Sequence, residues 1–164
     1  MIGAVDSEFG HIVQETRQRP EVLEAVRALY ADVQCEVDAR RPVCVVSGRC
    51  CRFEEFGHRL FVTTAELAAF MHALPAFPTR AGGDWDGTGC PFQSGKMCSV
   101  HTIRPFGCRM FFCDSTSTDW QNETYERFHA RLKRLHEELG VPYRYVEWRQ
   151  ALRELGLSGR FSSF

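Results

Sequence analysis

Apolar residues recur at helical spacing near the start of the chain. The first stripe consists of aliphatic residues three or four positions apart, Val22, Val26, Leu29, Val33 and Val37. Pro20 suits the first turn of a helix, so the pattern predicts an amphipathic helix from Pro20 to about Ala39. Pro42 ends this helix, because proline disfavours the helical conformation in the residue before it. Cys35 falls on the face opposite the stripe, and we expect it to lie outside any site.

A second helix is indicated by a capping signal rather than by periodicity. Thr63 and Glu66 have the spacing of a capping box, in which the hydroxyl accepts from the third helical N–H and the carboxylate reaches back to the cap. We therefore expect a helix over residues 64–74, stopped by Pro75.

The C-terminal third of the chain again has helical periodicity. Its apolar positions predict a long helix from about Asp119 to Leu139, closed by Gly140 in the left-handed conformation. A shorter helix is expected from about Val146 to Leu155, followed by a frayed tail over residues 156–164.

The middle of the chain lacks helical periodicity. Two short runs rich in β-branched and aromatic residues, Val43–Val46 and Arg59–Thr63, could pair as the strands of a hairpin. Residues 78–97 carry many glycines, a composition that stays irregular unless something external organises it. The prediction is an α+β fold: one helix-dominated domain over residues 1–155, with a short hairpin and an irregular cysteine-rich core organised by metal.

Composition and charge limit the partners of the protein. The chain has 164 residues, a mass of 18.8 kDa and a net charge of −1, which provides no general attraction to nucleic acid or to anionic lipid. We find no signal-peptide pattern and no apolar run long enough to span a bilayer. We therefore expect a cytoplasmic protein with no membrane or nucleic-acid partner, while the sequence leaves a protein partner open.

Cysteine is concentrated in the irregular middle of the chain. Seven of the eight cysteines lie between residues 44 and 113: Cys44, Cys50, Cys51, Cys90, Cys98, Cys108 and Cys113. So many thiols exceed what packing needs, and they indicate ligands for a soft metal or a disulfide network. Because disulfides do not persist in a reducing cytosol, metal binding is the favoured interpretation, with a disulfide-stapled or merely cysteine-rich core as the alternative.

The spacing of these cysteines leaves the metal open. No Cys-x2-Cys knuckle occurs, which argues against a simple zinc finger. Thiolates scattered over loops can hold zinc or an iron–sulfur cluster. Neighbouring side chains such as those of Cys50 and Cys51 do not easily face one ion, so either one of them is not a ligand or the centre has several metal atoms.

The cysteine pattern resembles the YkgJ-like cysteine-cluster family, described as zinc- or iron-chelating domain proteins. The matching residues are Gly48-Arg49-Cys50-Cys51-Arg52, Val62-Thr63-x2-Glu66, Cys90-Pro91-Phe92, Gly95-x2-Cys98-Ser99-Val100-His101-x2-Arg104-Pro105-x2-Cys108-Arg109 and Cys113. The family usually has a further cysteine where this chain has Ser47, so one possible thiolate is missing. The resemblance implies metal chelation by the seven cysteines in a bacterial cytoplasmic protein.

The same resemblance offers an enzymatic precedent. Flagellin lysine N-methylase has a similar cysteine pattern and is associated with an iron–sulfur centre. This chain shows no glycine-rich turn of its own for a methyl donor. The alternative function is therefore a metal-dependent enzyme for redox or group transfer on an unidentified substrate.

Five residues beside the cysteines are candidates for supporting the centre. Arg49, Arg52, Arg104 and Arg109 can stabilise thiolates by their charge, or can instead pair with nearby acids or clamp carbonyl groups. His101, three residues after Cys98, could reach the same metal, although packing is the better expectation.

The sequence thus predicts a metal-binding protein. We favour an iron–sulfur cluster over Zn²⁺, because the candidate ligands are all sulfur and adjacent arginines would offset the negative charge of a cluster.

Overall fold

The computed structural model describes residues 7–76 and 87–157. Its α-helices are α1 (Glu8–Thr16), α2 (Pro20–Arg40), α3 (Phe53–Phe56), α4 (Thr64–Ala73), α5 (Phe106–Arg109), α6 (Thr118–Leu139) and α7 (Trp148–Glu154). Single 3₁₀ turns are η1 (Arg49–Cys51), η2 (Leu74–Ala76), η3 (His101–Ile103) and η4 (Ser115–Ser117). The strands are β1 (Phe61–Thr63), β2 (Gln93–Ser94), β3 (Met97–Cys98) and β4 (Tyr145–Glu147). The predicted dominance of helix in an α+β fold is confirmed.

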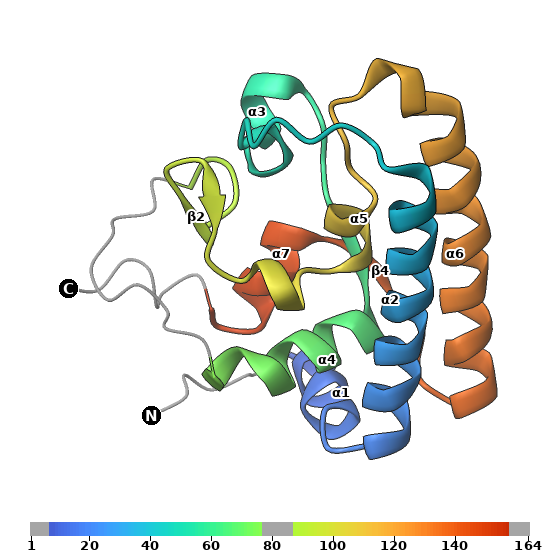
Figure 1. Ribbon diagram of the computed structural model, residues 1–164. Coiled ribbons are helices and arrows are strands. Elements are labelled where there is room, and N and C mark those ends of the chain that lie inside the picture. Colours follow the sequence, from blue (N-terminus) through green and yellow to red (C-terminus); the bar gives the residue numbers. More distant parts are fainter. Residues whose placement is uncertain (1–6, 77–86, 158–164) are drawn as a thin grey trace.

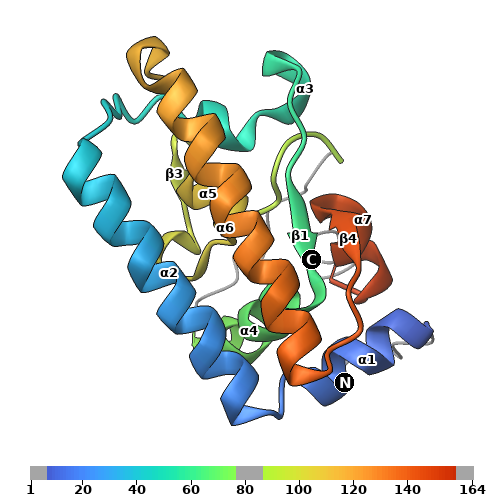
Figure 2. The same cartoon turned by 90° about the vertical axis from the view of Figure 1, so that its right-hand side faces the viewer.

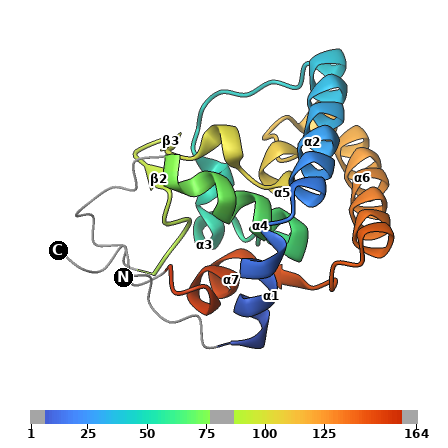
Figure 3. The same ribbon diagram turned by 90° about the horizontal axis from the view of Figure 1, so that it is seen from below.

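The two long helices α2 and α6 lie side by side and run in opposite directions (Figures 1 and 3). The apolar stripe predicted for α2 is buried, and part of it packs against α6 and α5. This shared cluster contains Leu29, Val33, Phe106, Met110, Phe128 and Leu132. Gly140 caps α6 in the left-handed conformation, with φ of 60°, as its sequence position predicts.

The predicted hairpin between Val43–Val46 and Arg59–Thr63 is wrong. Strand β1 pairs antiparallel with β4, with Val62 opposite Val146 (Figure 2). Val43–Val46 forms no strand, and Val46 has a φ of 51°, which interrupts an extended backbone. A short hairpin does exist, but β2 and β3 form it inside the glycine-rich segment.

The ends of the described chain differ from the expectation in two places. Helix α1 was not predicted; Ser7 caps it by accepting a hydrogen bond from Gly10 N at 3.0 Å. Leu157, placed by prediction in a frayed tail, is only 3 % exposed, and its N–H donates to Leu152 O at 2.8 Å. Residues 158–164 lie outside the described residues.

The main core lies between α1, α4, α7 and the β1–β4 ribbon. It comprises Phe9, Val13, Phe53, Leu60, Val62, Leu67, Ala68, Phe70, Met71, Leu74, Phe92, Val100, Val146, Trp148, Ala151, Leu152, Leu155 and Leu157. Cys90, Cys98 and Cys108 pack against its edge. The cysteine segments therefore rest on the apolar core, not on a separate lobe.

No helix within the described part of the chain is both long and apolar enough to cross a lipid bilayer.

The carboxylate of Glu66 connects three segments of the fold. It closes the predicted capping box by accepting from Thr63 N at 2.9 Å and from Thr63 Oγ1 at 3.0 Å. Its other oxygen accepts from Tyr30 Oη on α2 at 3.2 Å and from Phe106 N at the start of α5 at 2.7 Å. Because Glu66 is only 2 % exposed, these donors replace the water that its oxygens lose on folding.

His136 makes a second buried polar connection, between α6 and α4. Its Nε2 accepts from Ala65 N at 3.1 Å, so the ring proton lies on Nδ1, which donates to Leu132 O at 2.7 Å. The residue is 1 % exposed. Burial lowers its pKa, which keeps the ring neutral.

We predict that Glu66→Gln lowers the free energy of unfolding by about 2 kcal/mol. Each carboxylate oxygen of Glu66 accepts from a backbone N–H, and the amide nitrogen of glutamine, which cannot accept, must replace one of these oxygens. Urea titration measures this change. Glu137→Gln on the exposed face of α6 is the matched control, and we expect it to change stability by less than about 0.5 kcal/mol. Equal effects of the two substitutions would contradict a connecting role for Glu66.

The pH dependence of stability provides a separate prediction for the same residue. Burial raises the pKa of Glu66 above its ordinary value of 4.5, so just above that pH the folded protein holds a proton that the unfolded chain has released. The contribution of Glu66 to stability therefore falls as pH rises from 4.5 through the folded pKa. We expect the stability difference between wild type and Glu66→Gln to shrink over that window in unfolding titrations, and a constant or growing difference would contradict the prediction.

Candidate metal centre

The adjacent Cys50 and Cys51 lie on the 3₁₀ turn η1. Gly48 precedes the turn with a φ of 75°, and the tight bend brings the two Sγ atoms to 4.0 Å. The 3₁₀ turn thus supplies the bend that brings neighbouring sulfurs close, while the expectation that the two do not easily face one ion stays a prediction. Two sulfurs of one tetrahedral zinc site lie about 3.8 Å apart, since each Zn–S bond is about 2.3 Å.

Hydrogen bonds to backbone carbonyl groups hold Cys90 and Cys98 beside this turn. Cys90 N donates to Cys51 O at 2.8 Å. Gln93 Nε2 on β2 donates to Gly48 O at 3.0 Å, which ties the β2–β3 hairpin carrying Cys98 to the start of η1. These bonds do not involve the thiols, so a backbone amide and the Gln93 side chain hold the segments of Cys90 and Cys98 beside η1.

Cys108 approaches from a third direction, on the short helix α5. This helix begins at Phe106, whose N–H is held by Glu66. Arg109 Nε donates to Arg104 O at 2.8 Å and its Nη2 donates to Thr102 O at 2.8 Å, so its guanidinium closes the turn before α5. The ring of Tyr30 lies 4.1 Å from the same guanidinium.

The thiols lie close enough to change one another's pKa values. Cys51 Sγ lies 4.0 Å from Cys50 Sγ, and the neighbouring thiols of Cys50, Cys90 and Cys98 raise the pKa of Cys51, which favours Cys51 as an S–H donor. The bond from Cys51 lowers the pKa of Cys50 to about 6 and that of Cys98 to about 7. Burial raises the pKa of Cys108, and neighbouring thiolates raise it further. We call Cys50, Cys51, Cys90, Cys98 and Cys108 the inner thiols.

Cys44 and Cys113 lie at the edge of the site. Both are exposed, and Cys113 Sγ lies 3.8 Å from Ser47 Oγ, the position at which the resembled family usually has cysteine. A pocket of about 170 Å³, here called the cysteine pocket, brings both edge residues together with inner thiols. The cysteines in its lining are Cys44, Cys50, Cys51, Cys98 and Cys113.

The remaining expectations for the cysteines can be compared with the structure. Cys35 is exposed on α2 and lines neither pocket that contains cysteine, as predicted. All eight cysteines are free thiols, so no disulfide network forms. Within residues 7–76 and 87–157, no group of three or more His, Cys, Asp or Glu side chains is arranged to hold a metal ion. Metal binding therefore stays a prediction.

The arginines near the thiols mostly have structural partners. Arg49 lies over the ring of Phe56 at 4.8 Å, and Arg52 pairs with Glu55 at 3.5 Å. Arg104 Nη1 donates to His101 O at 2.6 Å, the carbonyl clamp considered from the sequence. Its charge also lowers the pKa values of Cys50, Cys98 and Cys108, as a smaller cause in each case.

His101 is exposed at the edge of the cysteine pocket. Its Nδ1 accepts from Arg104 Nη1 at 3.0 Å. Burial of part of the ring, followed by the charges of Arg104 and Arg109, lowers its pKa. The ring is thus held beside the thiols in its neutral form, and ligation by His101 stays a prediction.

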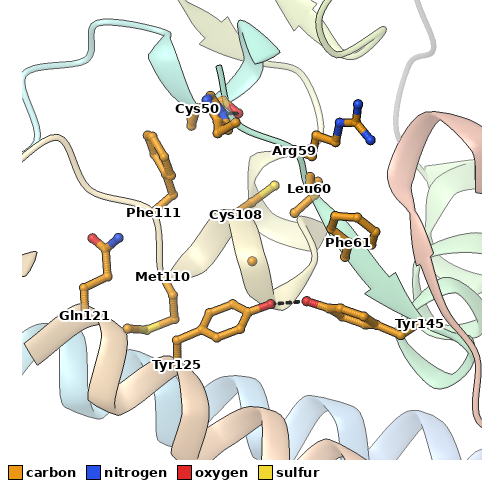
Figure 4. A pocket seen from close by; sticks show the side chains of 12 residues that line it. Cys50, Arg59, Leu60, Phe61, Cys108, Met110, Phe111, Gln121, Tyr125 and Tyr145 are labelled. Atoms are coloured by element: carbon orange, nitrogen blue, oxygen red, sulfur yellow. Dashed lines mark hydrogen bonds between the residues drawn. The ribbon is translucent and has the colours of Figure 1, made fainter. Parts of the chain in front are cut away.

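Sequence reasoning missed a second pocket that reaches Cys50 and Cys108. This tyrosine pocket also has a volume of about 170 Å³, and Figure 4 shows Tyr125 and Tyr145 at the end opposite Cys50. Their hydroxyl groups are hydrogen-bonded at 2.6 Å. His58 lines the pocket as well; its Nε2 lies 3.2 Å from Cys50 O, while its Nδ1 is buried without a partner in the described chain. No sequence signal could have joined these residues, because they come from segments far apart in the chain.

Comparison with protein-family models, with curated proteins and with solved structures finds no match to this chain. The resemblance to the YkgJ-like family therefore rests on the cysteine motifs alone.

Two glycines provide a matched test of how the backbone assembles the site. A Cβ at Gly89 would lie 2.8 Å from Cys51 O, whereas nothing lies within 4 Å of a Cβ at Gly87. Both have positive φ, of 61° and 86°, so alanine costs about 1–2 kcal/mol of backbone strain at either position.

We predict that Gly89→Ala destabilises the protein more than Gly87→Ala and separates Cys90 from Cys51, because the added methyl group collides with the carbonyl that accepts from Cys90. Denaturant titration measures the first effect. The second is measured as a lower yield of the Cys51–Cys90 disulfide after mild oxidation and peptide mapping. Equal yields in the two variants would contradict this assembly of the site.

Proposed function

We propose that this chain is a metal-binding protein whose clustered cysteines chelate a soft metal centre. The observation that supports this best is the cysteine pocket, whose lining brings together Cys44, Cys50, Cys51, Cys98 and Cys113 from separate segments of the chain. Thiolates are the preferred ligands of zinc and of iron–sulfur clusters. The chemistry of the donor set suits such a group, because all eight cysteines are free thiols and hydrogen bonds to Cys51 O and Gly48 O hold several of their segments side by side; metal binding would bring the sulfurs into ligand positions.

Within this proposal the inner thiols are the primary ligands, and Cys44 and Cys113 are reserve donors at the edge of the cysteine pocket. Arg104 would offset part of the negative charge that several thiolates create. His101 remains a candidate neutral ligand at the edge. We favour an iron–sulfur cluster over Zn²⁺ because five inner thiols exceed the four ligands of one tetrahedral ion. A cluster would supply electron transfer or a reactive iron, whereas zinc would mainly hold the loops together.

A second candidate function is a metal-dependent enzyme, the alternative raised by the resemblance to flagellin lysine N-methylase. The specific observation that favours it is the tyrosine pocket. Cys50 and Cys108 are the two thiols in its lining, and aromatic side chains form much of the rest of its wall. A purely structural centre needs no such access.

We predict that Cys98→Ser and Cys108→Ser each lower the bound metal by at least about half, because each removes a thiolate from the inner group. Elemental analysis after anaerobic purification measures metal per chain. Cys35→Ser is the matched control and keeps the full content, since Cys35 is exposed on α2 away from the site. Full metal content in both Cys98→Ser and Cys108→Ser would refute the assignment.

The identity of the centre is tested on the same anaerobic preparation. We expect a coloured protein with visible absorption, iron and acid-labile sulfide in matching amounts. A colourless protein with stoichiometric zinc and neither iron nor sulfide would exclude the cluster and leave chelation intact. Zinc in protein purified in air would not decide the question, because zinc accepts the same thiolates.

A further inference from the structure

The tyrosine pocket and the cysteine pocket share only Cys50 and Phe111 in their linings. Aromatic side chains form much of the tyrosine pocket, and hydrogen-bonding groups lie at its ends. From this arrangement we propose that the tyrosine pocket binds a neutral phenol with a single ring. The binding itself does not require metal, whereas a role for the pocket as a substrate site rests on the proposed centre.

Volume and wall chemistry suit one aromatic ring. A protein cavity of about 150 Å³ lined by apolar side chains binds benzene, and this pocket has a volume of about 170 Å³. Phe61 and Tyr145 in its wall are stacked with ring centroids 5.1 Å apart, and the buried Met110 also lines it. Such walls offer ring faces and a thioether, both of which contact aromatic ligands favourably.

The tyrosine pair explains why the ring should carry a hydroxyl group. In the 2.6 Å contact one tyrosine hydroxyl donates to the other, so one O–H of the pair has no acceptor among the described residues. A phenol oxygen can accept from this O–H and extend the chain of hydroxyl groups. Gln121 lines the same pocket; its Oε1 already accepts from Phe112 N at 3.0 Å, which leaves its N–H groups as further donors.

The opposite end of the pocket favours a neutral ligand. Cys50 lies there (Figure 4) and Cys108 also lines the pocket, so the groups offered to a ligand at this end include two thiols. The guanidinium of Arg59 at the rim points away from the pocket in the same view, so it does not offer a site for an anion inside. A phenol stays neutral at pH 7, because its pKa is near that of tyrosine, about 10. Bound at the tyrosine pair, its ring would extend toward Cys50 and Cys108.

The test is a titration of the reduced, isotope-labelled protein with phenol and, in parallel, with toluene, which has the same ring without the hydroxyl group. Backbone amide shifts report binding and its place. We expect the largest shifts at Gly107, Phe111 and Tyr145, and about five-fold tighter binding of phenol, the effect of one net hydrogen bond of about 1 kcal/mol. Equal affinities, shifts centred elsewhere, or no saturable shifts with phenol would each overturn the proposal.

Variants separate the hydroxyl groups from the pocket shape. The double variant Tyr125→Phe/Tyr145→Phe keeps both rings and should remove the preference for phenol over toluene, whereas each single variant leaves one hydroxyl that can still donate to phenol. Tyr143→Phe is the matched control: the hydroxyl of Tyr143 pairs with His129 Nε2 at 3.0 Å, outside this pocket, so the preference should persist. If the double variant does not fold, as judged from its amide spectrum, the comparison of phenol with toluene in the wild type decides the outcome. Retention of the preference in the folded double variant would contradict the assigned hydrogen bond.

The titration is carried out on protein as isolated and on protein treated with a chelator. If phenol binds neither preparation while the untreated protein holds stoichiometric metal, the phenol site is rejected and the proposed metal centre is retained. Phenol binding in both, with no metal in the untreated sample, would support the pocket and reject the centre.

Discussion

The buried carboxylate of Glu66 is the interaction on which the rest of this structure depends. It accepts four hydrogen bonds: two from its own helix cap at Thr63, one from Tyr30 on α2 and one from Phe106 on α5. Burying an isolated carboxylate costs desolvation free energy. The hydrogen-bond donors offset that cost only when all three segments are in place. One side chain thus couples the start of α4, the long helix α2 and the turn that carries Cys108.

From that anchor, hydrogen bonds to backbone carbonyl groups bring the thiols together. The bond from Cys90 N to Cys51 O and the bond from Gln93 Nε2 to Gly48 O hold the segments of Cys90 and Cys98 beside η1, and Arg109 closes the turn before the helix that carries Cys108. Because these bonds use amide and guanidinium donors, they leave the sulfurs available as ligands. A bound metal would then draw together thiols that are already neighbours, which lowers the entropy cost of forming the centre.

Cys50 links the two candidate functions. It lies in the cysteine pocket beside Cys51 and also in the tyrosine pocket beside Cys108. A metal held by the inner thiols would therefore adjoin a pocket whose other end presents paired hydroxyl groups. Such a position would distinguish a bound centre from a closed structural one, whose ligands face only one another.

The sequence by itself determined the features that depend on neighbours along the chain. Helix α2, the capping box at Thr63 and the left-handed cap at Gly140 follow from local periodicity and local hydrogen bonds, and all are present as predicted. Helical periodicity likewise placed Cys35 on the exposed face of α2. Tertiary structure decided what depends on segments far apart: β1 pairs with β4 and not with Val43–Val46, and the hydroxyls of Tyr125 and Tyr145 meet beside Cys50. Local propensity ranks a segment as strand or helix, but the choice of partner depends on burial and packing of the whole chain, which no short window of sequence contains.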